Sequence, residues 1–281
     1  MARPRSFQQV DVFTAQPFLG NPVAVVLDSI GLSTEQMQAF TDWTNLSEAT
    51  FVGPPTDPGA DYALRIFCPG RELPFAGHPT LGSCHAWLAA GGAPRSGGDL
   101  IVQECGAGLV RIRRDGSRLA FAAPPLLRGG PLSERDVDLL VRGLGLAPSD
   151  VVAHQWCDNG PPWQAVLLRS AELVRSIRPD TQVIDGLFVG VVGPEAAGSD
   201  TDFEVRAFFP KGEGMAEDPV TGSLNAALAQ WLITEDRAPH DYVAAQGSSV
   251  GRAGRVHVQR IGDDVWIGGA CTTVIDGVVS I

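Results

Sequence analysis

The sequence lacks the patterns that mark most nucleotide, metal and membrane proteins. The Gly-x-Gly segments at 106–108 and 212–214 do not continue into a G-x-G-x-x-G fingerprint or a P-loop. The five histidines form no H-E-x-x-H motif and no Cys/His cluster. No apolar run approaches the roughly 18 residues that a membrane helix requires. We therefore expect no cofactor, no bound metal and no membrane partner.

Positive charge and cysteine are also scarce. The 21 Lys and Arg residues are outnumbered by 32 Asp and Glu, for a formal net charge of −11, which argues against nucleic acid as a partner. The five cysteines include no C-x-x-C pair, as expected of reduced thiols in the cytoplasm. Residues 1–5 are followed by polar residues and not by the apolar core of a signal peptide. We expect a cytoplasmic protein.

What the sequence does contain is an internal repeat. Residues 78–88 and 218–228 match in register at Pro, Gly, Ser, Ala and Leu, and the segments 65–69 and 206–210 before them also agree. A repeat at this distance predicts two similar halves of about 140 residues each. We place the halves at 1–126 and 127–281, with a last strand near 272–281 that can pack on the first half.

The pattern of short strands and long helices predicts the fold class. Each half has several short β-branched runs and one long helix with few charges. The helical segments 86–90 and 226–229 are apolar nearly all round, as a helix enclosed by a sheet must be. We predict an α+β fold of two pseudo-symmetric halves, each a mostly antiparallel, barrel-like sheet wrapped around one central helix. The active site is expected in the cleft between them.

The starts of the two central helices indicate a binding site. Pro79 suits a first helical turn, which would make His78 the N-cap, although histidine is a poor cap. Asp218, before Pro219, is its counterpart in the repeat. Two helix N-termini at one cleft would offer unpaired N–H groups to a carboxylate. A small-molecule carboxylate is therefore the expected partner.

Small and hydroxyl-bearing residues near these helix starts extend the candidate site. Glycine lets the backbone approach a ligand closely, although Gly82 and Gly222 fit equally well with close packing of a helix on a sheet. Thr80 and Ser223 would add hydroxyl donors. Glu48 alone is as consistent with a solvated turn as with a site, but a Glu, a His and an Asp in one desolvated cleft would suffice for general acid–base catalysis.

Six segments carry a likeness to a known family. Residues 20–25, 45–51, 72–80, 217–223 and 247–256 read GNPVAV, NLSEATF, ELPFAGHPT, EDPVTGS and GSSVGRAGRV, and 267–269 reads IGG. They resemble the PhzF family over nearly the whole chain. The resemblance implies a fold similar to that of diaminopimelate epimerase, a homodimer, and catalysis without metal or organic cofactor.

The resemblance also implies an activity and assigns roles to residues. The activity is that of a trans-2,3-dihydro-3-hydroxyanthranilate isomerase, which moves a proton and a double bond in a small cyclic intermediate of secondary metabolism. Glu48 would be the acid–base that takes a proton from one ring carbon and returns it to another. His78, Asp218 and Ser223 would orient the substrate and assist proton relay. The predicted substrate-binding residues are Ser47, Gly77, Thr80, Thr221 and Gly222.

The chain departs from the family pattern after Ser223, where Leu224 and Asn225 replace the usual small residue and His. This change can reshape the pocket, so other substrates stay open: an antibiotic-pathway enzyme that catalyses tautomerisation or C–C cleavage is one alternative. An amino-acid epimerase on the same fold is another, although the helix starts lack the two cysteines of a two-thiol enzyme and Cys84 lies inside its helix. A non-enzymatic carboxylate binder is the third, and Glu48 argues against it.

Overall fold

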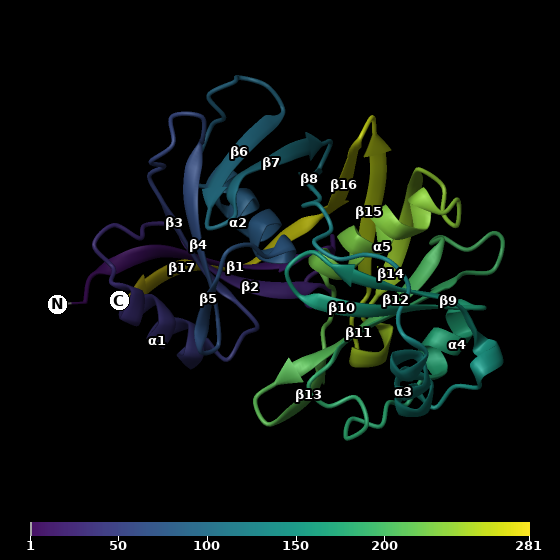
Figure 1. The fold of residues 1–281 in the computed structure, drawn as a ribbon. Helices are drawn as coiled ribbons and strands as arrows, with labels where there is room; N and C mark the ends of the chain where they lie inside the picture. The colour runs from purple at the N-terminus through teal and green to yellow at the C-terminus, as the bar shows by residue number, and fades with distance from the viewer. Residues whose placement is uncertain (1) are drawn as a thin grey trace. The chain divides into compact units, whose positions relative to one another are not determined.

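The computed structural model describes residues 2–281, which divide into two units (Figure 1). Unit 1 comprises the residues up to Ala122 together with Gly268–Ile281, and unit 2 comprises Ala123–Ile267. Among the described residues no helix is both long and apolar enough to span a membrane.

Unit 1 is mostly sheet with two helices. Its strands are β1 (Pro4–Val12), β2 (Asn21–Val26), β3 (Ala49–Gly53), β4 (Tyr62–Cys68), β5 (Arg71–Leu73), β6 (Leu100–Cys105), β7 (Gly108–Asp115), β8 (Arg118–Ala122) and β17 (Cys271–Ser280), and its helices are α1 (Thr34–Thr44) and α2 (Gly77–Ala89). The predicted capping box is present at the start of α1, where Ser33 and Gln36 bond each other's backbone N–H groups. In Figure 1 the yellow strand β17 runs beside the purple strand β1, and the two pair antiparallel.

Unit 2 has the same kinds of element. It contains β9 (Val151–Asp158), β10 (Pro162–Leu168), β11 (Phe188–Pro194), β12 (Phe203–Lys211), β13 (Gly214–Glu217), β14 (Asp241–Gln246), β15 (Gly254–Ile261), most of β16 (Asp264–Gly269), the α-helices α3 (Glu134–Leu144), α4 (Ala171–Ser176) and α5 (Gly222–Thr234), and the 3₁₀ turns Pro148–Asp150 and Ser248–Val250. Helix α3 begins at the predicted cap Ser133 and ends at Gly145, whose φ of 67° is left-handed, a conformation that glycine adopts without strain.

Strand pairing repeats between the units. In unit 1, β1–β2 is antiparallel, β2–β3 parallel, β3–β4 antiparallel, β4–β6 parallel and β6–β7 antiparallel. In unit 2, β9–β10, β10–β11, β11–β12, β12–β14 and β14–β15 follow the same alternation. The short strands β5 and β13 pair with β4 and β12 respectively. Two pseudo-symmetric α+β halves, predicted from the sequence repeat, are confirmed.

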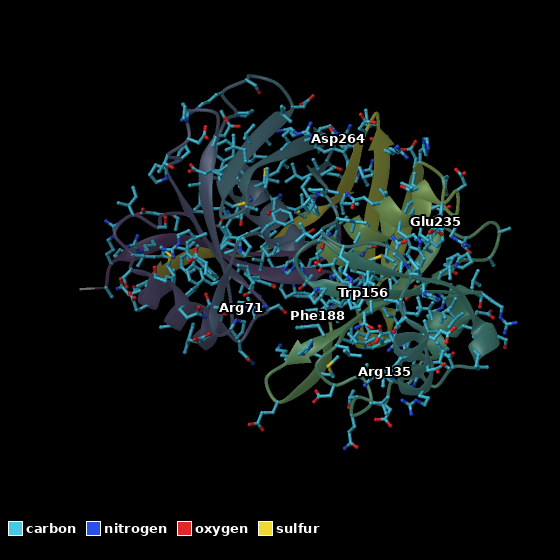
Figure 2. The ribbon with its side chains drawn as sticks, in the orientation of Figure 1. Arg71, Arg135, Trp156, Phe188, Glu235 and Asp264 are labelled. Atoms are coloured by element: carbon cyan, nitrogen blue, oxygen red, sulfur yellow. The ribbon has the colours of Figure 1, made fainter. Side chains whose placement is uncertain are left out.

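The long helix of each unit packs on its sheet with an apolar surface. Helix α2 contacts β1, β2, β3, β4, β8 and β17, and nearly all of its first ten residues are buried. Helix α5 contacts β9 and β15, and its side chains are buried on most sides. A separate cluster fills the space under α3 and α4 in unit 2, and Trp156, labelled in Figure 2, packs against it from β9. Removal of this apolar surface from water is the main driving force for folding.

The predicted starts of the central helices are wrong. Helix α2 begins at Gly77 with Ala76 as its N-cap, so His78 lies in the first turn and is not the cap. Helix α5 begins at Gly222 with Thr221 as its N-cap, so Asp218 and Pro219 lie before the helix. The first four N–H groups of a helix have no intrahelical partner, which is why Pro79 is tolerated inside the first turn. The short elements β5, β13 and α4 were not predicted.

Candidate active site

Glu48 and His78 meet at one edge of the sheet in unit 1. Strands β2 and β3 are parallel, with Ala24 opposite Ala49, so their N-terminal ends lie at the same edge. Glu48 directly precedes β3, and its carbonyl accepts a hydrogen bond from the N–H of Ala24 at 3.4 Å. Helix α2, which packs on both strands, presents His78 at this edge. The sheet thus supplies the carboxylate and the helix supplies the imidazole.

The contact between the two side chains is short and desolvated. Oε2 of Glu48 lies 3.2 Å from Nε2 of His78, and the exposed fractions of the two side chains are 16% and 6%. Burial lowers the pKa of His78 from its usual 6.5 to about 3, although a hydrogen bond to the backbone of Pro22 acts in the opposite direction. The imidazole is therefore neutral at neutral pH, and its contact with Glu48 is not an ion pair.

Asn21 completes the group in unit 1. It is the first residue of β2 and is 1% exposed. Its side-chain nitrogen lies 3.3 Å from Nδ1 of His78, so the two ring nitrogens face different partners. The sequence analysis quoted Asn21 in a family segment but did not identify it as a site residue. Its signal was a polar residue at the start of an otherwise apolar strand.

The other predicted residues of unit 1 are placed differently. Ser47 is half-buried and Gly77 is buried, next in sequence to Glu48 and His78 respectively. The hydroxyl of Thr80 is fully buried and accepts a hydrogen bond from Gln103 at 3.1 Å. The Thr80 side chain is therefore engaged in the core.

Gly82 shows why α2 contains a glycine where it packs on the sheet. A Cβ atom added there would lie 2.4 Å from Cγ1 of Val23 and 3.0 Å from Cγ2 of Val12. Both of these side chains are fully buried strand residues. Of the two interpretations of Gly82, close packing of helix on sheet is the one with direct support.

Asp218 in unit 2 belongs to a buried polar network. Its Oδ2 accepts a hydrogen bond of 2.6 Å from the hydroxyl of Thr221. Its carbonyl accepts one from the side chain of Gln246 at 3.1 Å, and its N–H donates to Ala207 on β12 at 2.9 Å. The predicted residues Asp218 and Thr221 are thus brought together, and Gln246 is a third member that the sequence analysis did not identify.

Ser223 lies in the first turn of α5, next to Gly222, which is buried. Its hydroxyl accepts a hydrogen bond from the indole N–H of Trp163 at 3.2 Å, and its carbonyl accepts one from Asn159 at 2.8 Å. Trp163 stands near the start of β10. Its indole therefore fixes the side chain of Ser223 without using the serine's own proton, which stays available for donation.

Leu224 and Asn225 point into unit 2. A Cβ atom added at Gly190 on β11 would lie 2.5 Å from Cδ1 of Leu224, so the leucine packs directly on that strand. Asn225 is 1% exposed and donates hydrogen bonds to the Thr221 carbonyl and to the side chain of Gln246. These two side chains therefore form part of the packing behind the start of α5.

Comparisons with known proteins all point to one family. A family model described as phenazine biosynthesis-like protein, PhzC-PhzF, matches residues 10–277. The chain is 35% identical to Antisense-enhancing sequence 1 of Schizosaccharomyces pombe, with 97% of each chain covered. It is 33% identical to the trans-2,3-dihydro-3-hydroxyanthranilate isomerase of Pseudomonas aeruginosa, over 90% of this chain and 89% of that one.

A solved structure gives the same result for the fold. The phenazine biosynthesis protein of the PhzF family from Bacillus anthracis matches with a TM-score of 0.83 at 22% identity, covering 99% of this chain and all of that one. The predicted family resemblance, fold class and isomerase class are confirmed by these relatives.

Proposed function

Because the chain belongs to the PhzC-PhzF family of phenazine biosynthesis-like proteins, we propose that it is a cofactor-independent isomerase of a small cyclic carboxylic acid. The reaction moves one proton and one double bond, as in the isomerisation of trans-2,3-dihydro-3-hydroxyanthranilate. The relative from Pseudomonas aeruginosa that bears this name supports the substrate class. The cytoplasmic location and the homodimer stay predictions from the sequence.

The observation that supports this chemistry best is the contact between Glu48 and a neutral His78. A neutral imidazole carries one hydrogen, on either of its two nitrogens. With the hydrogen on Nε2, that hydrogen is on the nitrogen that faces the carboxylate of Glu48, and Nδ1 can accept from the amide of Asn21. With the hydrogen on Nδ1, the unprotonated Nε2 faces the protonated carboxyl of Glu48.

The two forms of the imidazole match the two states that an acid–base residue needs. In the first step the Glu48 carboxylate takes a proton from a ring carbon, and the electron pair of the broken C–H bond shifts the double bond. In the second step the Glu48 carboxyl returns a proton to another carbon of the same system. His78 stays uncharged beside Glu48 in either state, which avoids the cost of a buried imidazolium.

Asp218 and Ser223 are proposed to act on the same substrate. The Asp218 carboxylate is oriented by Thr221, and Ser223 is oriented by Trp163. The N–H groups at the start of α5 would favour the substrate carboxylate. These roles follow from the family resemblance, and the hydrogen bonds support them by showing how each side chain is fixed.

The alternative of a two-thiol epimerase has little support from the side chains. Burial raises the pKa of the Cys84 thiol to about 12, and a catalytic base must lose its proton near the working pH. Cys84 is fully buried within α2. It is therefore poorly suited to abstract a proton from a substrate.

The test is turnover of trans-2,3-dihydro-3-hydroxyanthranilate, followed by its ultraviolet spectrum, in the wild type and in Glu48→Gln. The substitution keeps the shape of the side chain and removes its acid–base function, so turnover should fall about a hundredfold or more. Glu35→Gln, in the exposed first turn of α1, is the matched control and should keep wild-type turnover. Equal turnover in Glu48→Gln and the control would refute the proposed role of Glu48.

A further inference from the structure

Gln246, the last residue of β14, connects the strand to the Asp218 segment. Its side chain is 1% exposed. Oε1 accepts hydrogen bonds from the backbone N–H of Thr221 at 3.0 Å and from the side chain of Asn225 at 2.8 Å. Nε2 donates to the carbonyl of Asp218 at 3.1 Å and to the hydroxyl of Thr221 at 2.9 Å. One amide thus contacts Asp218 in the segment before α5, the N-cap Thr221, and Asn225 in the first turn of the helix.

The directions of these hydrogen bonds are fixed by groups that have only one role. The Thr221 N–H can only donate and the Asp218 carbonyl can only accept, so the Gln246 amide has a single satisfactory orientation. Nε2 therefore donates to the Thr221 hydroxyl. That hydroxyl has one hydrogen of its own, which is directed at Oδ2 of Asp218, 2.6 Å away. The orientation of the amide is transmitted to the carboxylate through one hydroxyl group.

The backbone that carries Gln246 is itself tightly held. Gly247 has a φ of 98°, and a Cβ atom there would lie 2.6 Å from the Pro219 carbonyl oxygen, so only glycine allows this approach to the Asp218 segment. The hydroxyl of Ser248 donates to Oε1 of Glu204 at 2.6 Å, and Arg175 contacts the other oxygen of Glu204 at 3.2 Å.

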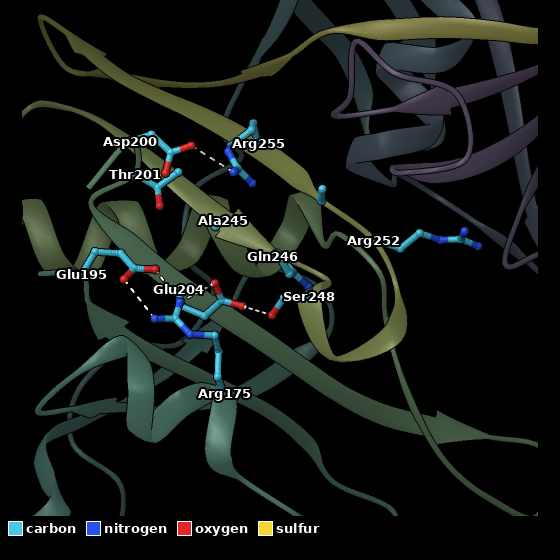
Figure 3. Close-up of a pocket in the computed structure, with 11 residues that line it drawn as sticks. Arg175, Glu195, Asp200, Thr201, Glu204, Ala245, Gln246, Ser248, Arg252 and Arg255 are labelled. Carbon is cyan, nitrogen blue, oxygen red and sulfur yellow. Dashed lines mark hydrogen bonds and ion pairs between the residues drawn. The ribbon is translucent and has the colours of Figure 1, made fainter. Parts of the chain in front are cut away.

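Figure 3 shows these side chains around a cavity of about 290 Å³, to which Gln246 also contributes. Burial raises the pKa of Glu204, and the hydrogen bond from Ser248 acts against this. The loop after β14 is therefore anchored by the hydrogen bond between Ser248 and Glu204. Such an anchor limits movement of the Gln246 amide.

We propose that Gln246 is a positioning residue, which fixes the Asp218 carboxylate for catalysis through the hydroxyl of Thr221. The inference rests on the proposed function, because it assigns Asp218 to the catalytic group. It predicts that loss of the amide donor lowers kcat and leaves KM nearly unchanged, because the substrate still binds but meets a misdirected carboxylate.

The first test is Gln246→Glu, which keeps the side-chain size and removes the Nε2 donor. At pH 8 its kcat should be about tenfold to a hundredfold below that of the wild type, with KM within about twofold. As the pH falls, protonation of the new carboxyl restores one donor, so the ratio of mutant to wild-type kcat should rise. Gln230→Glu is the matched control, because Gln230 on α5 also donates to a backbone carbonyl, that of Pro124. Gln230→Glu should show neither the lower kcat at pH 8 nor the rise of the kcat ratio at lower pH.

The second test addresses the hydroxyl of Thr221, which lies between the Gln246 amide and the Asp218 carboxylate. Thr221→Val removes the hydroxyl and should lower kcat about tenfold or more, and Thr221→Ser, which keeps the hydroxyl, should lower kcat less than Thr221→Val does. If Gln246 acts through Asp218, then Gln246→Glu should have little further effect in an Asp218→Asn background. Thermal unfolding of each variant separates lost folding from lost positioning.

The outcomes distinguish this inference from the proposed function. If Asp218→Asn and Glu48→Gln lower turnover but Gln246→Glu and Thr221→Val do not, the positioning role is refuted and the proposed function stands. If Glu48→Gln has wild-type turnover, or the wild type does not convert the substrate, the proposed function fails. Amide hydrogen exchange then tests the contact itself: Gln246→Leu, which removes the Oε1 acceptor, should expose the Thr221 N–H to exchange, and unchanged protection would overturn the inference.

Discussion

The side-chain nitrogen of Asn21 lies 3.3 Å from Nδ1 of His78, on the ring nitrogen that does not face Glu48. The amide can donate to Nδ1 when the ring hydrogen is on Nε2, but it cannot when the hydrogen is on Nδ1, so the two forms of the ring differ at Asn21. We therefore expect Asn21, a residue that is not expected to touch the substrate, to influence the tautomer of His78.

Asn21→Asp tests that arrangement. A carboxylate beside Nδ1 stabilises the charged imidazole, so the pKa of His78 should rise from about 3, and turnover should fall because the hydrogen is held on Nδ1. Nitrogen NMR of labelled histidine, recorded against pH, reports both the pKa and the tautomer. Asn21→Ala is the control that removes the contact without adding charge, and its His78 should stay neutral. An unchanged titration in Asn21→Asp would contradict the assignment.

Acid stability should depend on His78. Its pKa is about 3 in the folded protein and 6.5 in the unfolded chain, so below pH 6.5 the unfolded state binds a proton that the folded state does not. The contribution of His78 to stability is therefore present above pH 6.5 and is lost as the pH falls toward 3, by about 2 to 3 kcal/mol between pH 7 and 4.5.

Urea denaturation of the wild type and of His78→Gln at these two pH values measures this effect. The glutamine variant should lose less stability on acidification, because it has no group to protonate. His240→Gln, at an exposed position, should behave like the wild type. Equal pH dependence in all three proteins would show that His78 is not buried in its neutral form.

Gly82→Ala should destabilise unit 1 by about 1 to 3 kcal/mol, the usual cost of overpacking a core. The new methyl group would meet the side chain of Val23 at 2.4 Å. Val23→Ala in the same background should recover part of the loss, and a double-mutant cycle measures this coupling. Gly277→Ala, where no atom lies within 4 Å, is the control and should change stability by less than about 0.5 kcal/mol.

Cys84 should resist alkylation in the folded enzyme, because with a pKa of about 12 only about one thiol in ten thousand is ionised at pH 8. Mass spectrometry after iodoacetamide treatment should find Cys105, which is only partly buried, modified well before Cys84. Turnover should persist throughout. Rapid modification of Cys84 together with loss of activity would revive the two-thiol alternative.

The sequence predicted the features that depend on local periodicity and on the repeat. The duplicated segments gave two similar halves, and the apolar character of α2 and α5 identified the enclosed helices. Caps with a side-chain acceptor, at Ser33 and Ser133, were also predicted correctly. In each case the residues that determine the structure are neighbours in the chain.

The helix starts were predicted wrongly because the preference of proline for helix starts fits both a proline inside the first turn and a proline just before the helix. A proline is tolerated anywhere in a first turn, where N–H groups have no helical partner. Pro79 stands within α2 and Pro219 stands before α5, although the repeat aligns them. Which of the two occurs depends on packing and on the buried amide of Gln246, whose contacts join residues more than 20 positions apart.

The supporting residues of the site escaped prediction for a related reason. Asn21 reaches His78 across 57 positions, and Trp163 reaches Ser223 across 60. Both stand at or near the start of a strand that pairs in parallel with the next one along the chain. Parallel pairing needs a crossover connection, so no sequence spacing indicates which polar residues will meet. Glu48 itself was identified only through the family resemblance.

The pairing of β1 with β17 has a consequence for the order of events on the ribosome. Strand β17 follows the whole of unit 2 in the chain, so unit 1 cannot complete its sheet until unit 2 has been synthesised. Unit 2 is continuous in sequence and has all its strand partners as soon as it emerges. The N-terminal part of a chain usually folds first during synthesis, but here β1 can pair only with β2 until the last strand has been made, and its second edge stays open while unit 2 is synthesised.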